Sequence, residues 1–160
     1  MINVIKVASY IFERYQRENN EKIDEMKLHK LLYFAQREAI IQTGNPLFDA
    51  QFAAWKYGPV IVAVRNSYRS NALTNLPSEE ELKPYQTSLD YVFKHYATKD
   101  SWTLSMLTHG ESCWQNARIG YGQDDHCDVL INTEDITKDA ERIRFRRFYF
   151  ENIAPNLQDS

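Results

Sequence analysis

The fold of this chain is decided by residues 27–68, which read KLHKLLYFAQREAIIQTGNPLFDAQFAAWKYGPVIVAVRNSY. In the first part of this stretch, apolar residues recur at intervals of three and four, the spacing that places side chains on one face of a helix. The residues that define this face are Leu28, Leu31, Leu32, Ala35 and Ala39. The polar residues that lie mostly off it are His29, Lys30, Gln36, Arg37 and Glu38. We therefore predict an amphipathic helix that packs one face against a core.

The end of this helix is predicted at Gly44, because glycine readily adopts the left-handed conformation that closes a helix and Asn45-Pro46 then favours a turn. Residues 48–56 show no helical face, so we expect an extended segment there. Proline fixes φ near its helical value and needs no amide hydrogen, so we predict that Pro59 begins the next helix. The residues expected to be buried along that helix are Val60, Val64 and Tyr68.

The same residues resemble the signature of the Panacea domain, the family of SocA-like antitoxins. The resemblance is carried by KLHKLLYFAQ, then GNPLF, then AAWKYGPV, in this order and at this spacing. It continues through LTHGESCWQNAR at 107–118 and INTEDI at 131–136, so it extends over nearly the whole chain. One departure is Val62, which stands in a region where members of the family often carry a proline.

The resemblance implies an antitoxin, which neutralises a cognate toxin protein by binding it directly, and it implies no enzymatic activity. In some relatives it implies delivery of the toxin to a protease, such as an AAA+ machine of the ClpXP type. Because Trp, Tyr and Arg side chains dominate many interfaces, we expect the aromatic turn after the extended segment to bind the partner. The predicted partner-binding residues are Trp55, Lys56, Tyr57, Gly58, Pro59 and Arg65. The competing interpretation is that Trp55 fills the core and Gly58-Pro59 only makes a turn.

Length and composition favour one domain, because 160 residues can bury a real core and no Pro/Gly/Ser-rich linker divides them. We expect this domain to span residues 1–154, with a flexible tail at 155–160. The net charge of −3 disfavours nucleic acid and anionic lipid as partners. No apolar run reaches the length of a membrane span, the first segment does not read as a signal peptide, and two cysteines are too few for a secreted disulfide scaffold. We therefore expect a cytoplasmic protein.

The remaining segments predict a mainly α fold, with about six or seven helices around the central helix and a small β element. A first helix is indicated by Val4, Val7, Ala8, Ile11 and Tyr15, and Asp24 is expected to cap the central helix. Later helices are expected from Pro84, from Ser101 and after Thr133, and the capping-box match at Ser78 is weak. Residues 129–131 are expected to form a short strand that pairs with residues 52–55. The residues expected on one face of the last helix are Ile136, Ala140, Ile143 and Phe150.

Two other functional classes have candidate residues in the sequence. Residue types that bind zinc occur at His109, Cys113, His126 and Cys127, but without the paired spacing of structural zinc sites. The same cysteines and histidines are the residue types of a cysteine nucleophile and its base, but no pattern in the sequence indicates that they act together. We therefore predict no metal and no cofactor, since a phosphate-binding glycine loop is also absent. Arg142, Arg144, Arg146 and Arg147 could serve a nucleic-acid-binding regulator. The simpler interpretation is that acids early and bases late in a helix follow its dipole.

Overall fold

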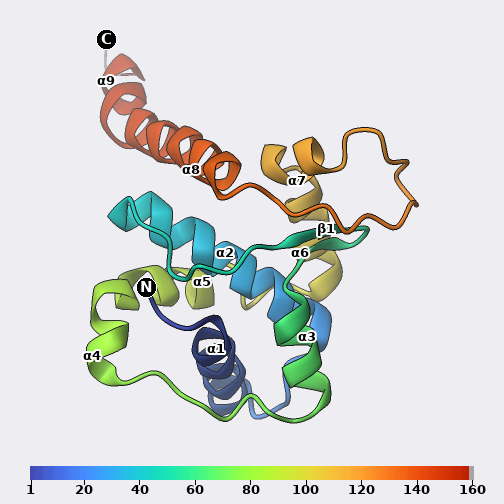
Figure 1. The fold of residues 1–160 in the computed structure, drawn as a ribbon. Coiled ribbons are helices and arrows are strands. Elements are labelled where there is room, and N and C mark those ends of the chain that lie inside the picture. Colours follow the sequence, from blue (N-terminus) through green and yellow to red (C-terminus); the bar gives the residue numbers. More distant parts are fainter. Residues whose placement is uncertain (159–160) are drawn as a thin grey trace.

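Helix α2, Glu25–Thr43, runs through the middle of the molecule with other elements packed around it (Figure 1). The computed structural model describes residues 1–158, and in it fifteen of the nineteen residues of α2 are buried. Elements from both ends of the chain contact this helix, so it forms the centre of the core. The predicted class, a mainly α domain with a small β element, is confirmed.

The predicted amphipathic character of α2 is only half right. All five residues of the predicted apolar face are buried, as expected. The prediction that the polar residues lie off the buried surface is wrong, because the following five are buried as well: His29, Lys30, Gln36, Arg37 and Glu38. The physical reason is that neighbouring elements pack around the whole circumference of the helix, which leaves no side for solvent along this stretch.

Both predicted ends of α2 are confirmed. The Asp24 side chain accepts a hydrogen bond from the amide of Lys27 at 2.8 Å, which satisfies one of the unpaired donors of the first turn. At the other end Gly44 has a φ of 78°, and its amide donates to the carbonyl of Ile40. This left-handed closure is the one that glycine favours.

Helix α1, Val4–Asn19, lies beside α2, and its predicted buried residues Val7, Ala8 and Ile11 are in the core. Helix α3, Val62–Arg69, packs against both α1 and α2. The contact between α1 and α3 includes an edge-to-face aromatic pair, whose ring centroids are 6.1 Å apart, between Phe12 and Tyr68.

The extended segment after α2 becomes the first strand of a hairpin. Strand β1, Ala53–Trp55, pairs antiparallel with β2, Gly58–Val60, and Trp55 stands opposite Gly58. The prediction that Pro59 begins a helix is wrong, since Pro59 lies in β2 and α3 starts three residues later. Proline lacks an amide hydrogen, and an edge strand such as β2 is a position in a sheet that tolerates this loss.

The predicted pairing of residues 129–131 with residues 52–55 is confirmed as an isolated bridge on the other edge of β1. Ala53 stands opposite Leu130, and the amide of Ile131 donates to the carbonyl of Phe52 at 2.7 Å. Strand β1 is therefore flanked by β2 on one edge and by a segment from far along the chain on the other.

The middle of the chain adds a run of short helices. Helix α4, Glu79–Leu82, begins with a complete capping box between Ser78 and Glu81, so the weak sequence match at Ser78 is a real cap. The 3₁₀ turn η1, Lys83–Tyr85, contains Pro84, and helix α5, Gln86–His95, follows two residues after the predicted start.

Helix α6, Ser101–His109, is capped by Asp100, one residue before the predicted Ser101. It is followed by α7, Ser112–Ala117, whose Trp114 is buried. Among the described residues, none of the helices combines the length and the apolar character that crossing a lipid bilayer requires.

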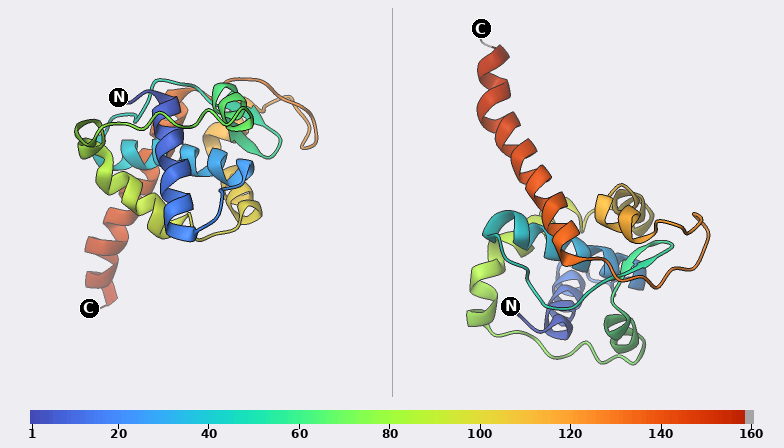
Figure 2. Two further views of the ribbon diagram at one scale, coloured as in Figure 1. Left: turned by 90° about the horizontal axis from the view of Figure 1, so that it is seen from below. Right: turned by 45° about the horizontal axis from the view of Figure 1, so that its top comes forward.

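The last helical segment projects from the body of the molecule (Figure 2). It consists of α8, Thr133–Phe148, the π turn η2, Tyr149–Ile153, and α9, Ala154–Gln158. Its cap is Asn132, not Thr133. Ile136 and Ala140 are buried as predicted, but Phe150 is 61% exposed because the helix continues past the part of the domain that covers it. The tail predicted at 155–160 overlaps α9, and its last two residues, 159–160, lie outside the described residues. The domain boundary at 154 stays a prediction.

Candidate functional site

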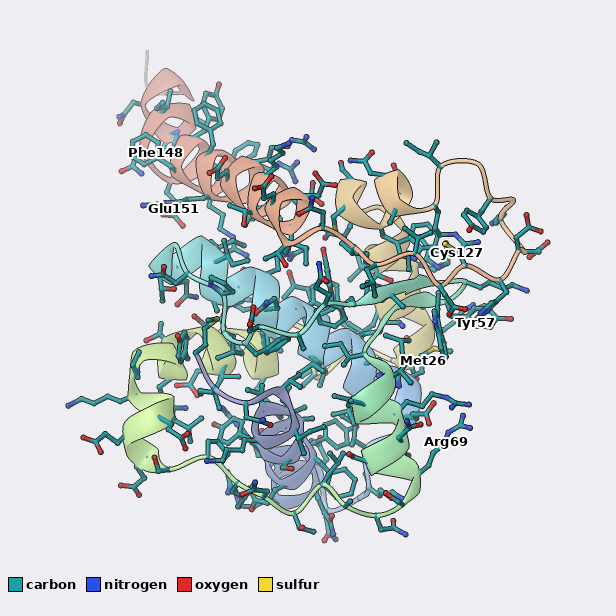
Figure 3. All side chains as sticks on the ribbon, in the orientation of Figure 1. Met26, Tyr57, Arg69, Cys127, Phe148 and Glu151 are labelled. Carbon is teal, nitrogen blue, oxygen red and sulfur yellow. The ribbon has the colours of Figure 1, made fainter. Side chains whose placement is uncertain are left out.

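A pocket of about 320 Å³ opens between the first half of α2, the hairpin β1–β2 and α3. We call it the hairpin pocket and define it by six of its lining residues: His29, Lys30, Trp55, Gly58, Arg65 and Arg69. Figure 3 labels Met26, Tyr57 and Arg69, which also line it and mark the side of the molecule where the pocket lies. Residues that are far apart in the sequence thus meet at one place.

The hairpin is fixed in position by side chains of α6, α7 and the residue after α7. Ser105 donates to the carbonyl of Tyr57 at 2.6 Å, and the indole of Trp114 donates to the carbonyl of Trp55 at 2.9 Å. The guanidinium of Arg118 donates to the carbonyl of Ala54 at 2.8 Å. Because these bonds hold the hairpin backbone, the wall of the pocket is preorganised by the fold.

Gly58 is required at the turn of the hairpin for two reasons. Its φ is +115°, a backbone conformation that residues with a side chain rarely adopt. A Cβ at this position would also lie 2.4 Å from the hydroxyl of Thr108 and 2.8 Å from Cε of Lys30. Only glycine therefore allows the hairpin to approach α2 and α6 this closely.

Two titratable side chains of α2 lie in the wall of the pocket. Lys30 is 1% exposed and His29 is 3% exposed. Burial lowers the pKa of Lys30 to about 7, since the charged ammonium loses its hydration. Burial, together with the positive charge of Lys30, lowers the pKa of His29 to about 4, so this imidazole is neutral at pH 7.

Several charged groups form the outer wall. Arg69 pairs with Glu25 at 2.7 Å, and Lys56 pairs with Asp124 at 3.3 Å. Arg65 has no acidic partner among residues 1–158 and lies with its guanidinium carbon 5.6 Å from the centre of a Trp55 ring. The mouth of the pocket therefore combines a stacked arginine with an aromatic surface.

An exposed apolar patch lies next to the pocket. Tyr57, Trp102 and Met106 are 45%, 59% and 60% exposed, and the ring centroids of Tyr57 and Trp102 are 5.7 Å apart. Trp102 and Met106 are four residues apart on α6, so both point from one face of that helix. We call these three residues the Tyr57 patch. Large aromatic side chains that remain exposed together are typical of surfaces that bind another protein.

The predicted partner-binding residues gather in this region. Trp55, Lys56, Tyr57, Gly58 and Arg65 all line the hairpin pocket, whereas Pro59 is buried in β2. Their role in binding stays a prediction. Trp55 is half-buried, so it fills the core only in part, and its indole donates to Asp128 at 2.9 Å.

Sequence reasoning missed five residues of this site, namely His29, Lys30, Arg69, Trp102 and Met106. A signal for the first two was present in the run LLYFA at 31–35. Five consecutive apolar residues cover more than one face of a helix, which indicates a helix buried on all sides. Polar residues next to such a run must then be buried too.

The candidate metal ligands are not brought together. His109 stacks on Trp114 with centroids 4.4 Å apart, and His126 is exposed and contacts Asp128 at 2.7 Å. Cys113 and Cys127 are buried, and burial raises the pKa of the Cys113 thiol, which keeps it protonated.

A different group of ligand atoms lies within 4.8 Å of one another in the described part of the chain, from Glu111, Cys113 and Asp139. All three already have partners. Arg37 donates to Glu111, the Cys113 sulfur lies 3.1 Å from the Tyr33 hydroxyl, and Asp139 accepts from the Cys113 amide. This arrangement joins α2, α7 and α8 and reads as a structural network.

The basic run of α8 is partly used by the fold. Arg147 donates to Glu38 at 2.7 Å, and Arg142 donates to Asp139 and Ser112. Only Arg144 and Arg146 of the four arginines are exposed without such contacts among the described residues. The structural interpretation of this charge pattern is therefore favoured over a nucleic-acid surface.

Comparison with known proteins gives two matches to this chain. A family model described as "Antitoxin SocA-like, Panacea domain" matches residues 28–115. A curated relative, "Antitoxin SocA" of Caulobacter vibrioides (strain NA1000 / CB15N), is 41% identical over 49 residues, which are 31% of this chain and 26% of that protein. The match thus spans about a quarter of the length of that relative. No solved structure matches.

Proposed function

Because the chain belongs to the SocA-like antitoxin family defined by the Panacea domain, we propose that it neutralises a cognate toxin by direct protein–protein binding. The family match covers α2, the hairpin, α3 and α6, which are the elements that build the hairpin pocket and the Tyr57 patch. The main support for the proposal is that the residues matched by the family model are also those that build this exposed surface.

We place the contact with the toxin on the Tyr57 patch and on the mouth of the hairpin pocket. Tyr57, Trp102 and Met106 supply exposed apolar area, and the neighbouring Lys56 and Arg65 supply charge. A protein interface of standard size buries about 1,600 Å² in total, and a few aromatic anchors near its centre dominate its affinity. A surface with aromatic side chains on a preorganised hairpin fits this description.

The mechanism that we propose needs no chemical step by the antitoxin. A stoichiometric complex blocks the toxin by covering its active surface or by holding it in an inactive form. The finer proposal, taken from the family resemblance, is that the bound toxin is handed to a protease. It requires that the half-life of the toxin shorten in the presence of both the antitoxin and an AAA+ protease, and an unchanged half-life contradicts this role alone.

The experiment is coexpression with the protein encoded beside this chain, in a host whose growth that protein arrests. We expect growth to be restored and the two proteins to copurify. The double variant Tyr57→Ala/Trp102→Ala should weaken binding by at least about tenfold, since each anchor contributes more than about 1 kcal/mol.

The matched control is Phe148→Ala. Phe148 is also an exposed aromatic residue, but it lies on the projecting end of α8, away from Tyr57 (Figure 3). It should leave rescue and binding unchanged. Absence of both rescue and copurification contradicts the antitoxin function, whereas rescue that depends on Phe148 and not on the Tyr57 patch contradicts the proposed surface.

A further inference from the structure

Lys30 is a buried cation without a partner. The side chain is 1% exposed, and no hydrogen bond from its ammonium and no ion pair to it are found among residues 1–158. Its Nζ lies against the hairpin turn, where a Cβ on Gly58 would be 2.9 Å away. Buried charges in proteins are nearly always paired, so an unpaired one in a pocket wall points to a partner that arrives from outside.

A second buried group in the same wall also lacks a partner. Both ring nitrogens of His29 are buried without a hydrogen bond in the described part of the chain, and the nearest carboxylate oxygen, on Glu25, is 3.8 Å from Nε2. One nitrogen of a neutral imidazole is a donor and the other an acceptor, so this wall contains an N–H without an acceptor among the described residues.

The pocket also carries an excess of positive charge. Of the four cationic side chains in its wall, Lys56 and Arg69 are paired with carboxylates. Lys30 at the inner wall and Arg65 at the mouth have none among the described residues. Among the described residues that line the pocket, only Glu25 is acidic, and it already pairs with Arg69.

From these contacts we propose that the hairpin pocket binds an oxyanion, a carboxylate or a phosphate group, which accepts hydrogen bonds from Lys30 and Arg65. A metal ion does not fit, because the wall is positively charged and holds a single carboxylate. A purely apolar ligand fits less well, because it offers the buried Lys30 amine no hydrogen-bond acceptor. The half-buried ring of Trp55 gives the body of the ligand an apolar surface beside the anionic group.

The volume of about 320 Å³ lies at the lower end of the range for small-molecule sites, so a compact group suits it. Two sources present the same chemistry. One is an acidic side chain of a protein partner, and the other is a small phosphorylated molecule. The first source rests on the proposed function, whose toxin contact includes the mouth of this pocket. Anion binding itself is measured on the purified chain alone, so its failure is distinguishable from failure of the antitoxin function.

The experiment is a titration followed by NMR amide shifts, at constant ionic strength set with chloride. Blocked N-acetyl-aspartate amide represents an acidic side chain, and inorganic phosphate represents a phosphorylated molecule. We expect saturable shifts at residues 29–30, 55–58 and 65 with at least one probe. Tighter binding of the aspartate probe identifies the ligand as an acidic side chain of a protein partner. Tighter binding of phosphate identifies it as a small phosphorylated molecule.

The decisive variant is Lys30→Met, which keeps an unbranched side chain of similar length and removes the amine. It should weaken binding by at least about tenfold, because it removes a charge-assisted hydrogen bond. Arg65→Gln, at the more accessible mouth, should weaken binding severalfold, which provides a second test if Lys30→Met perturbs the fold. Arg144→Met removes one exposed positive charge on α8 and should leave the affinity unchanged. Absence of saturable shifts with either probe, or equal affinities of wild type and Lys30→Met, overturns the proposal.

Discussion

The two halves of α2 bury polar side chains to the same extent but use them differently. In the second half, Gln36 donates to the carbonyl of Phe48 and accepts from the amide of Leu47. Arg37 donates to Glu111, while Glu38 accepts from Arg147. Each of these side chains ties the central helix to another segment.

In the first half, Lys30 and His29 line the hairpin pocket, and neither side chain makes a hydrogen bond to another segment among residues 1–158. Their neighbour Lys27 shows that this is no general property of the first half, since its ammonium contacts the hydroxyl of Tyr15 and the carbonyl of Ala97, both at 3.3 Å. Burial alone therefore does not separate the polar residues that hold the fold together from those for which we propose a ligand. What distinguishes them is whether the fold supplies the partner.

The largest effect on stability should come from a substitution in the second half of α2, where the buried polar side chains have partners. Arg37→Leu leaves the largely buried carboxylate of Glu111 without its guanidinium and should lower the free energy of unfolding by about 3–5 kcal/mol. Urea denaturation followed by circular dichroism measures this change. Arg144→Leu, an exposed arginine of α8, should change it by less than about 0.5 kcal/mol. A small effect of Arg37→Leu would mean that the network does not hold the fold together.

A smaller loss of stability is expected from a substitution where the hairpin meets the first half of α2 and α6. Gly58→Ala forces an unfavourable φ and a close contact with Thr108 and Lys30, so it should lower the free energy of unfolding by about 2–4 kcal/mol. Gly120→Ala is the matched control, because Gly120 also has a positive φ of 91° but nothing within 4 Å of an added Cβ. The difference between the two variants measures the close approach of the hairpin to α2. Equal losses would contradict that packing.

The sharpest comparison is between the two buried lysines of the first half. Lys30→Met removes an unpaired charge and should raise the free energy of unfolding by roughly 1–2 kcal/mol. Lys27→Met removes two hydrogen bonds and should lower it by about 1 kcal/mol. Thermal unfolding in phosphate-free buffer measures both. Changes of the same sign would mean that the two hydrogen bonds of Lys27 do not stabilise the fold.

The smallest effect, the pH dependence of stability, follows from the pKa of Lys30. The folded chain releases this proton near pH 7, whereas the unfolded chain holds it up to its ordinary pKa of 10.5. Between these values the unfolded state binds more protons, so raising the pH stabilises the fold, by up to about 1 kcal/mol per pH unit near pH 7–8. Subtracting the pH profile of Lys30→Met isolates this contribution. Identical profiles would show that Lys30 does not titrate in this window.

Much of the fold could be predicted because it depends on local chemistry. Asp24 and Gly44 end α2 as predicted, since capping requires only the residue and its nearest neighbours. Pro59 was placed wrongly because its fixed φ suits both the first turn of a helix and an edge strand. Which of the two forms depends on Gly58 and on its contacts with α2 and α6.

The family signature, the central helix with its apolar face, the ends of that helix and the aromatic turn after it can all be predicted from the sequence. Each of these follows from spacing or from the conformational preference of single residues. The packing of distant segments, in contrast, buries the polar side of α2 and supplies partners to Gln36, Arg37 and Glu38, but none to His29 and Lys30 among residues 1–158. The reason is that a hydrogen-bond partner for a buried side chain comes from a different segment of the chain, and its position is fixed only when all the segments have packed together.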